Sequence, residues 1–327
     1  MKQAAADAGL TEEEISNPDT GMYTASAGST GMLYGNMVKM DRVGVMRSSP
    51  MGVVASVVGT LSFNLVSAFK ILGSSCGFAS ACASSAHAMG YAFDEIANGK
   101  QKRMFVVGGE DGDLRTILPF GAMRALSLQK DPAKASRPYD KNRDGFVGTG
   151  GAVVAVLEDA ETAAKRGAKI YAEMLGWGQG SDGYNVAIPH PKGEGLARAI
   201  ENAFKDSGIS GESVEYINTH GTSTPIGDVA ELNGISKAFG GVPSAALSST
   251  KSVTGHGLSL AGVMEGAFCA LGMSEGFMPG SANIEEMDEA AKPYNILTQT
   301  KYEAPEIAMS LSSGFGGANT ALIFKKA

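Results

Sequence analysis

The stretch Leu72–Gly99, LGSSCGFASACASSAHAMGYAFDEIANG, joins a short run of small and apolar residues to a helical pattern. One helix face is predicted from six small or apolar residues at helical spacing: Ala86, Met89, Gly90, Phe93, Ile96 and Ala97. Gly99 suits the end of this helix, and the apolar run at 104–107 predicts the next strand. Cys82 therefore lies at a strand-to-helix turn of a strand–helix–strand unit, which is typical of an α/β fold.

The same alternation continues along the chain. Further strands are predicted at 152–157, 170–177, 214–218, 245–249, 307–312 and 320–324, and helices at 158–166, 195–206, 226–239 and up to residue 273. In both halves a strand of small residues leads into an Ala/Gly-rich helix, which indicates an internal duplication. Thr11 and Glu14 have capping-box spacing. The uncharged segment 48–69 is interrupted by Pro50, Gly59 and Asn64, so we expect a pair of buried helices rather than a membrane span.

Composition excludes several classes of function. The 327 residues include 27 Lys and Arg against 34 Asp and Glu, and a net charge of −7 argues against binding the phosphates of a nucleic acid. The three cysteines form no CxxC pair, so neither a disulfide framework nor a zinc cage is indicated, and a reducing compartment is expected. Residues 1–16 lack the apolar run of a secretory signal, so we expect no export.

Cys82 is a candidate nucleophile. At a helix N-terminus, unpaired N–H groups and the positive end of the helix dipole favour a thiolate, although a lone cysteine in an apolar run is more often structural. His220 and His256 each follow a predicted strand, in Gly/Ser/Thr-rich loops where side chains of separate strands can converge. We expect His87 to pack on its helix and His190 to lie in a surface loop. No carboxylate or cysteine stands at metal-ligand spacing beside His220 or His256.

Three further features are candidates for the site: the Lys251–Glu265 pair, the loop 314–317 and the loop 130–146. Lys251 and Glu265 flank His256 in sequence, and such a pair either satisfies two buried charges or tunes the imidazoles. The loop Gly314-Phe-Gly-Gly317 permits close approach of main chain to a ligand, so its N–H groups could hold an oxyanion. The long polar loop 130–146 is also a candidate functional segment.

Four segments, taken together and in this order, resemble the β-ketoacyl-acyl-carrier-protein synthases of the thiolase superfamily, and among them the elongating type I enzymes. They are SACASSAH at 80–87, NTHGTSTPIGD at 218–228, TKSVTGH at 250–256 and GFGGAN at 314–319. The resemblance runs from Met1 to Lys326, whereas family members usually begin about eighty residues earlier. It implies an α/β, thiolase-like αβαβα fold whose N-terminal part is truncated. Its pseudo-duplicated halves would be residues 1–160, carrying the nucleophile, and 161–327, carrying both histidines.

The resemblance implies a decarboxylative Claisen condensation in fatty-acid elongation, an acyltransferase reaction. Cys82 would accept an acyl group, and malonyl on acyl carrier protein would enter with Thr222 and Thr224 on its pantetheine arm. His220 and His256 would stabilise the enolate formed as CO2 departs. The resemblance makes Lys251 and Glu265 a catalytic pair, and Asp228 and Glu231 a supporting network. It places the oxyanion hole at the amides of Cys82 and Phe315, and Phe315 is also the gate. The acyl pocket would be lined by Phe120, Met123 and Phe146.

No metal is implied, and no cofactor beyond the phosphopantetheine of the carrier. The resemblance also implies a cytoplasmic homodimer whose partner is acyl carrier protein, with no nucleic acid and no membrane. Because the usual carrier is acidic, we expect a basic surface near the entrance. Lys39, Arg42 and Arg47 are its candidates, and a solvated loop is the alternative.

Two positions depart from the family pattern. Ser313 stands where an aromatic residue usually precedes the gate, and Gly257 where Ser often follows the histidine. These leave the acyl-length preference open, as well as the choice between fatty-acid and polyketide pathways. The alternatives are a thiolase, which usually carries a second cysteine that 314–319 lacks, a non-catalytic chain-length subunit, which lacks the nucleophile, and an inactive fragment.

Overall fold

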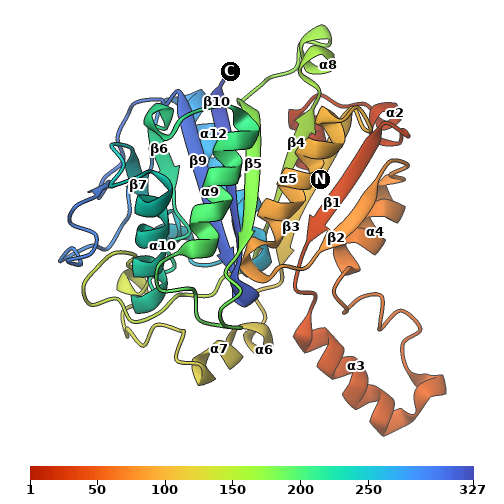
Figure 1. Cartoon of the computed structure of the whole chain (residues 1–327). Helices are drawn as coiled ribbons and strands as arrows, with labels where there is room; N and C mark the ends of the chain where they lie inside the picture. Colours follow the sequence, from red (N-terminus) through yellow and green to blue (C-terminus); the bar gives the residue numbers. More distant parts are fainter.

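The computed structural model describes residues 1–327 and stacks helices and two sheets in five layers (Figure 1). A four-stranded sheet has the strand order β2-β1-β3-β4, and a six-stranded sheet the order β5-β10-β9-β6-β7-β8. In each sheet parallel and antiparallel neighbours are mixed. The predicted α/β class and αβαβα layering are confirmed.

The strands divide between the sheets at about the middle of the chain. The first sheet contains β1 (Thr20–Ala25), β2 (Ser75–Phe78), β3 (Arg103–Glu110) and β4 (Gly151–Glu158). The second contains β5 (Ala172–Ser181), β6 (Tyr216–Asn218), β7 (Ala246–Ser248), β8 (Asn295–Ile296), β9 (Ile307–Gly314) and β10 (Ala318–Lys326). That the halves are related by duplication stays a prediction.

The helices fill the other three layers and the connections. They are α1 (Lys2–Asp7), α2 (Glu12–Ile15), α3 (Thr30–Val43), α4 (Thr60–Phe69), α5 (Ser84–Ala97), α6 (Leu114–Ile117), α7 (Pro119–Ala122), α8 (Ala160–Lys165), α9 (Glu194–Ser207), α10 (Pro225–Ala238), α11 (Lys251–Thr254) and α12 (Ala261–Glu275). Short 3-10 turns are η1 (Val45–Arg47), η2 (Ala81–Ala83), η3 (Pro132–Lys134), η4 (Gly211–Ser213), η5 (Leu258–Leu260) and η6 (Phe315–Gly317). Every helix and strand predicted after residue 100 is present, with ends shifted by a few residues.

The middle layer consists of α5 and α12, packed between the two sheets (Figure 1). Small residues permit this packing, since a Cβ on Gly262 of α12 would lie 2.6 Å from the Cβ of Ala86 on α5. Strand β3 shows how the layers divide the side chains, because Met104 and Val106 belong to the central core while Phe105 and Val107 face the outer side. Helix α4 covers that outer side, and α9 packs on the far face of the second sheet.

The prediction for the uncharged segment 48–69 is wrong. Residues 51–59 form turns, and only 60–69 are helical, as α4. Gly59 adopts φ of +104° immediately before α4, so the chain turns there instead of continuing a helix. None of the helices has the length and apolar content needed to span a bilayer.

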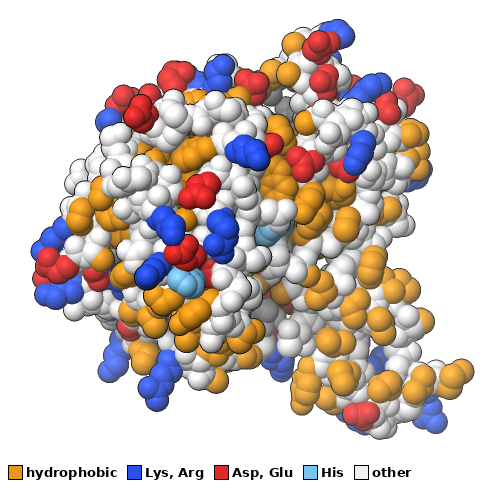
Figure 2. All heavy atoms as spheres, in the orientation of Figure 1, with side chains coloured by type: hydrophobic (Ala, Val, Ile, Leu, Met, Phe, Trp, Pro, Cys, Tyr) orange, Lys and Arg blue, Asp and Glu red, His pale blue; other side chains and the backbone are white.

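Residues 28–59, which we call the arm, project from the layers with α3 at their centre (Figure 1). Figure 2 shows a largely hydrophobic surface over this part of the molecule. Large apolar side chains are exposed there, among them Tyr34, Met37, Met46 and Val53, with Met46 at 96%. An apolar surface of this kind marks a site of interaction in soluble proteins.

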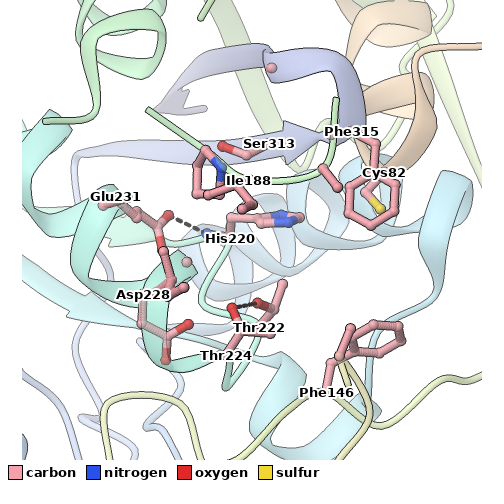
Figure 3. A pocket seen from close by; sticks show the side chains of 18 of the residues that line it. Cys82, Phe146, Ile188, His220, Thr222, Thr224, Asp228, Glu231, Ser313 and Phe315 are labelled. Carbon is pink, nitrogen blue, oxygen red and sulfur yellow. Dashed lines mark hydrogen bonds between the residues drawn. The ribbon is translucent and has the colours of Figure 1, made fainter. Parts of the chain in front are cut away.

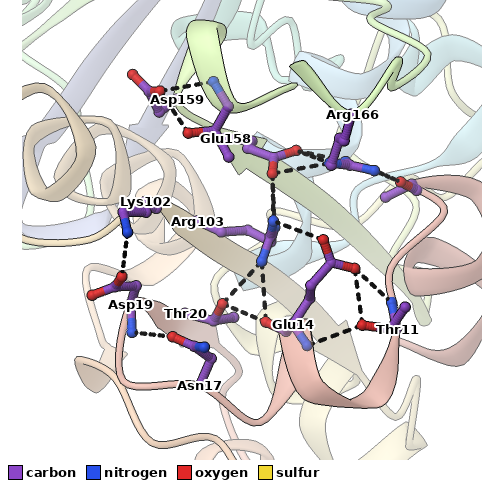
Figure 4. Close-up of polar contacts among 12 residues, drawn as sticks. Thr11, Glu14, Asn17, Asp19, Thr20, Lys102, Arg103, Glu158, Asp159 and Arg166 are labelled. Atoms are coloured by element: carbon purple, nitrogen blue, oxygen red, sulfur yellow. Dashed lines mark hydrogen bonds and ion pairs between the residues drawn. The ribbon is translucent and has the colours of Figure 1, made fainter. Parts of the chain in front are cut away.

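A buried polar network joins the N-terminal helices to the first sheet (Figure 4). The predicted capping box of Thr11 and Glu14 is present at α2. Arg103 of β3 donates to the Glu158 carboxylate of β4 from Nε and Nη2, at 3.1 and 2.5 Å, and to Thr20. Arg166 donates to the same carboxylate and to the carbonyl of Ala8, so Glu158 links three segments.

We expect Glu158→Gln to lower the free energy of unfolding by about 3 kcal/mol, because removing one charge of a buried pair leaves the other uncompensated. The side chains of Arg103 and Glu158 are only 7% and 6% exposed. Urea denaturation measures the loss. Glu161→Gln is the matched control, because its ion pair with Lys165 is almost fully exposed, so its stability should hardly change. Equal stability of the two variants would contradict the assignment.

Candidate active site

A cavity of about 280 Å³ lies between loops of both halves, and Cys82, His220 and His256 all line it. Cys82 comes from the turn between β2 and α5, and His220 from the loop after β6. The backbone of His256 is fixed beside the segment before β4, because its N–H donates to the carbonyl of Val147 at 2.7 Å. Figure 3 shows the His220 imidazole extending toward Cys82.

Cys82 sits in η2 after Ala81, whose φ of +50° is unusual for a residue other than glycine. Burial raises the pKa of the thiol to about 12, and the acidic groups Glu110 and Glu265 add to this against the opposing charge of Lys251. The expectation that the helix start favours a thiolate is therefore wrong for the free site, because desolvation outweighs the helix dipole. Cys82 is a neutral thiol at neutral pH.

The two imidazoles meet at right angles, with ring centroids 5.2 Å apart and an interplanar angle of 88°. Burial and the nearby charge of Lys251 hold the pKa of both His220 and His256 well below the usual value, so both are neutral at pH 7. Nδ1 of each ring is buried without a partner. Since an orphaned acceptor costs less than an orphaned N–H, the proton belongs on Nε2 of each ring.

Lys251 and Glu265 form a fully buried ion pair, with side chains 1% and 0% exposed. Neither residue lines the cavity. Burial raises the pKa of Glu265 to about 7, while the Lys251 charge and hydrogen bond oppose the shift. The pair therefore affects the histidines through its field rather than by contact with a ligand.

The loop that carries His220 is held from below by Glu231. Its carboxylate accepts the N–H of His220 at 2.6 Å and of Gly221 at 2.8 Å. Burial raises the pKa of Glu231 to about 7 and of Asp228 to about 6. Asp228 accepts the N–H of Ser223 at 3.1 Å, so both carboxylates fix the backbone of the same loop.

Tyr139 and Arg143 complete this network, and sequence reasoning did not identify them as site residues. The Tyr139 hydroxyl donates to Thr219 Oγ1 at 2.6 Å, and its N–H donates to Asp228 at 3.1 Å. The Arg143 guanidinium lies 3.1 Å from Asp228 and 2.6 Å from Asp288. Both residues belong to the polar loop 130–146. The length of this loop was the only feature of the sequence that indicated a functional role.

Aromatic side chains form one wall of the cavity. Phe120, Met123, Phe146 and Phe315 all line it, as the resemblance implies. The Phe120 ring lies 5.3 Å from that of Phe146 and 5.8 Å from that of Phe315, measured between centroids. The Phe146 ring stands edge-on to His256 at 5.3 Å. An apolar wall thus reaches from the histidine to the glycine loop.

Polar side chains line other parts of the cavity. Thr222 and Thr224 line the cavity, and their hydroxyls lie 3.0 Å apart (Figure 3). Ser313 also lines it and donates to Asn319 Oδ1 at 2.7 Å. Lys39, Arg42 and Arg47 lie on the arm and do not line the cavity.

The glycine loop packs directly against the turn that carries Cys82. A Cβ on Gly314 would lie 2.5 Å from the Ser80 carbonyl oxygen and 3.1 Å from the Cys82 nitrogen. The Cys82 N–H favours loss of the proton from its own sulfur, but by less than burial opposes it. The amides of Cys82 and Phe315 therefore belong to neighbouring segments at the same end of the cavity.

Segment 182–193 is a part of the site that the sequence did not reveal. Asp182 accepts the N–H of His190 at 2.9 Å and the side-chain amide of Asn319 at 3.0 Å. His190 lies in a partly exposed loop, as expected, but it is half-buried and also lines the cavity, as Ile188 does. No sequence motif marks the segment, since the contacts that place it come from the distant strand β10.

No group of three or more His, Cys, Asp or Glu side chains is arranged to hold a metal ion. Five neutral groups line the cavity instead: the Cys82 thiol, the imidazoles of His220 and His256, and the hydroxyls of Thr222 and Thr224. Such an arrangement suits covalent transfer to sulfur and stabilisation of a developing oxyanion.

Comparison with known proteins agrees with this chemistry. The model of the N-terminal domain of β-ketoacyl synthases matches residues 1–163, and that of the C-terminal domain matches 171–285. The 3-oxoacyl-[acyl-carrier-protein] synthase 1 of Haemophilus influenzae is 44% identical over the whole chain, and that of Escherichia coli is 42% identical. The chain spans 80% of the length of each.

Solved structures give the same result. A β-ketoacyl synthase from Burkholderia phymatum matches with a TM-score of 0.93 at 33% identity, covering 100% of this chain and 80% of the other. A type II polyketide ketosynthase, solved with its acyl carrier protein and bound to a hexaketide, matches with a TM-score of 0.94 at 26% identity, covering 100% and 82%. The chain belongs to the β-ketoacyl synthase family.

Proposed function

We propose that this chain is a 3-oxoacyl-acyl-carrier-protein synthase, an acyltransferase that condenses a Cys82-bound acyl group with malonyl on acyl carrier protein. The observation that carries the proposal is the presence of one thiol and two neutral imidazoles on a single cavity. The relatives named 3-oxoacyl-[acyl-carrier-protein] synthase support the same reaction.

Acyl transfer is the first step. The Cys82 sulfur attacks the thioester carbonyl of the acyl carrier, and the C–S bond to the carrier breaks. Because the pKa of Cys82 is raised to about 12, the thiol loses its proton only as the attack proceeds. The departing carrier thiolate takes up the proton, so the step is balanced.

Decarboxylation follows when the malonyl thioester enters along Thr222 and Thr224. The bond to the carboxylate breaks, CO2 leaves, and its electron pair forms an enolate. Nε2–H of His220 and of His256 donates to the enolate oxygen, where negative charge develops only in the transition state. Neutral imidazoles suit this role, because each donates a hydrogen bond to the enolate oxygen without transferring its proton.

Condensation completes the cycle. The enolate carbon attacks the Cys82 thioester, and the amides of Cys82 and Phe315 hold the resulting oxyanion. The C–S bond to Cys82 then breaks and the thiolate takes up a proton from solvent. Phe120, Met123 and Phe146 provide an apolar wall for the acyl chain, and Phe315 stands as the gate.

Acyl carrier protein is the proposed partner, and its phosphopantetheine is the only prosthetic group that the reaction uses. The polyketide relative solved with its own carrier supports this partner. We also place the enzyme in the cytoplasm as a homodimer. The exposed apolar side chains of the arm, which include Tyr34 and Met46, are the surface that a second copy would cover.

Cys82→Ala should abolish acyl-enzyme formation and lower condensation by at least about a thousandfold, because the nucleophile is gone. Mass spectrometry after incubation with an acyl-carrier thioester measures the adduct. His256→Ala should keep the adduct but slow the release of CO2 from malonyl carrier. Cys76→Ala is the control, because this exposed thiol lies outside the cavity and its loss should leave the adduct intact. An unlabelled Cys82 in the wild type would refute the proposal.

Alkylation of Cys82 should rise with pH throughout the accessible range. Iodoacetamide reacts with the thiolate, and since burial raises the pKa to about 12, the thiolate fraction grows about tenfold per pH unit below that value. Rates measured from pH 6 to 10 in the Cys76→Ala background report on this thiol. A plateau reached below pH 8 would instead indicate a thiolate–imidazolium pair and contradict the assignment.

Reversing the charge of Lys39, Arg42 and Arg47 to Glu should weaken carrier binding by about tenfold at low salt, and by less at high salt. These residues lie on the arm, at the opposite end of the molecule from α8 (Figure 1). Lys165→Glu on α8 is the control, because it changes charge far from the arm. Titrations that are unchanged at low salt would show that the carrier docks elsewhere.

A further inference from the structure

The turn that presents Cys82 is closed by hydrogen bonds among its own residues. The Ser80 N–H donates to Ser84 Oγ at 2.9 Å, and the Ser84 hydroxyl donates to the Ala81 carbonyl at 2.6 Å. The Ala83 N–H donates back to the Ser80 carbonyl at 3.2 Å. With Ala81 at a φ of +50°, this is a strained turn that needs its surroundings to hold it.

His87, one turn into α5, makes two contacts with this turn. Nδ1 lies 2.9 Å from Ser80 Oγ and 3.1 Å from the Ala83 carbonyl oxygen. A carbonyl only accepts, so the second contact requires a hydrogen on Nδ1, which the Ser80 hydroxyl then shares as acceptor. The imidazole thus joins the residues on both sides of Ala81 and Cys82.

The position of the ring is itself fixed. His87 is buried, and its ring stands edge-on to Trp177 of β5, with centroids 6.1 Å apart at 85°. Burial lowers the pKa of His87, while hydrogen bonds to the Ala83 carbonyl and the Gln179 side chain oppose the shift, so the ring stays neutral at pH 7. On the other side, Gly314 presses against the Ser80 carbonyl.

We propose that His87 is a positioning residue for Cys82, and that its hydrogen bonds to Ser80 and Ala83 hold the thiol where it can attack a thioester. His87 does not line the cavity, so it acts through the turn and not on a substrate. The proposal rests on the proposed role of Cys82 as nucleophile. Acyl transfer needs the thiol and therefore depends on His87. Decarboxylation occurs at His220 and His256 and does not.

The test compares two substitutions of His87. Leu has a similar volume and no N–H, while Asn places an amide N–H close to the position of Nδ1. We expect His87→Leu to slow acylation of Cys82 by about tenfold to a hundredfold, the cost of a misplaced reacting group. Release of CO2 from malonyl carrier should stay within about twofold. His87→Asn should recover most of the acylation rate, and Ser80→Ala should lose part of it.

Glu95→Gln is the matched control on the same helix. It changes the carboxylate that accepts from Ser74, which lies outside the turn, so both half-reactions should be unchanged. Iodoacetamide alkylation of Cys82 gives a second readout that needs no acyl substrate, and His87→Leu should alter its rate as well. If the wild type alkylates normally yet forms no acyl-enzyme, the proposed function fails while the positioning of the thiol is still measured.

Three results would overturn the role of His87. The first is a folded His87→Leu variant that acylates and alkylates like the wild type. The second is an equal loss of acylation and decarboxylation together with a lower unfolding temperature, which shows general destabilisation. The third is a defect in His87→Leu that His87→Asn does not relieve, which shows that the N–H is not the cause.

Discussion

The close contact of α5 with α12 sets the geometry on which the site depends. Both helices begin beside the cavity, since α5 starts two residues after Cys82 and α12 starts five residues after His256. Their separation at this end is set by Gly262, where a Cβ would meet that of Ala86 at 2.6 Å. The abundance of small residues thus has a functional consequence: it brings the nucleophile-bearing turn of one half to the histidine of the other.

Burial determines the protonation states of Cys82, His220 and His256. It raises the pKa of the Cys82 thiol and lowers those of His220 and His256, so the free site holds no charge on any of the three. The ionisable groups nearby are the Lys251–Glu265 pair and the carboxyl groups of Asp228 and Glu231 that hold the His220 loop. Neutral donors directed into the cavity stabilise the negative charge that develops in the transition state more than charge already present in the bound substrate. This difference lowers the barrier to reaction.

Local pattern was enough to predict most of the fold, because helical spacing and apolar runs are properties of neighbouring residues. The turn at Cys82 and the loops at His220 and His256 were predictable for the same reason. The thiolate expectation failed because the helix dipole is local whereas burial depends on the whole chain. Tyr139, Arg143 and Asp182 were missed because their partners lie tens of residues or more away in sequence. The uncharged composition of segment 48–59 suggested burial, but the segment lies in the arm, which projects from the layers.

The same long-range contacts explain how two substrates can use one cavity. The apolar wall of Phe120 and Phe146 belongs to the segment between β3 and β4, while Thr222 and Thr224 belong to the loop after β6 and Ser313 to β9. Asn319 connects segment 182–193 to the glycine loop, since it donates to Asp182 and accepts from Ser313. Ser313 is small and its hydroxyl is engaged by Asn319, so no aromatic side chain stands before Phe315. The glycine loop therefore contacts both linings of the cavity, because Phe315 packs near Phe120 while Asn319 holds Asp182 and Ser313.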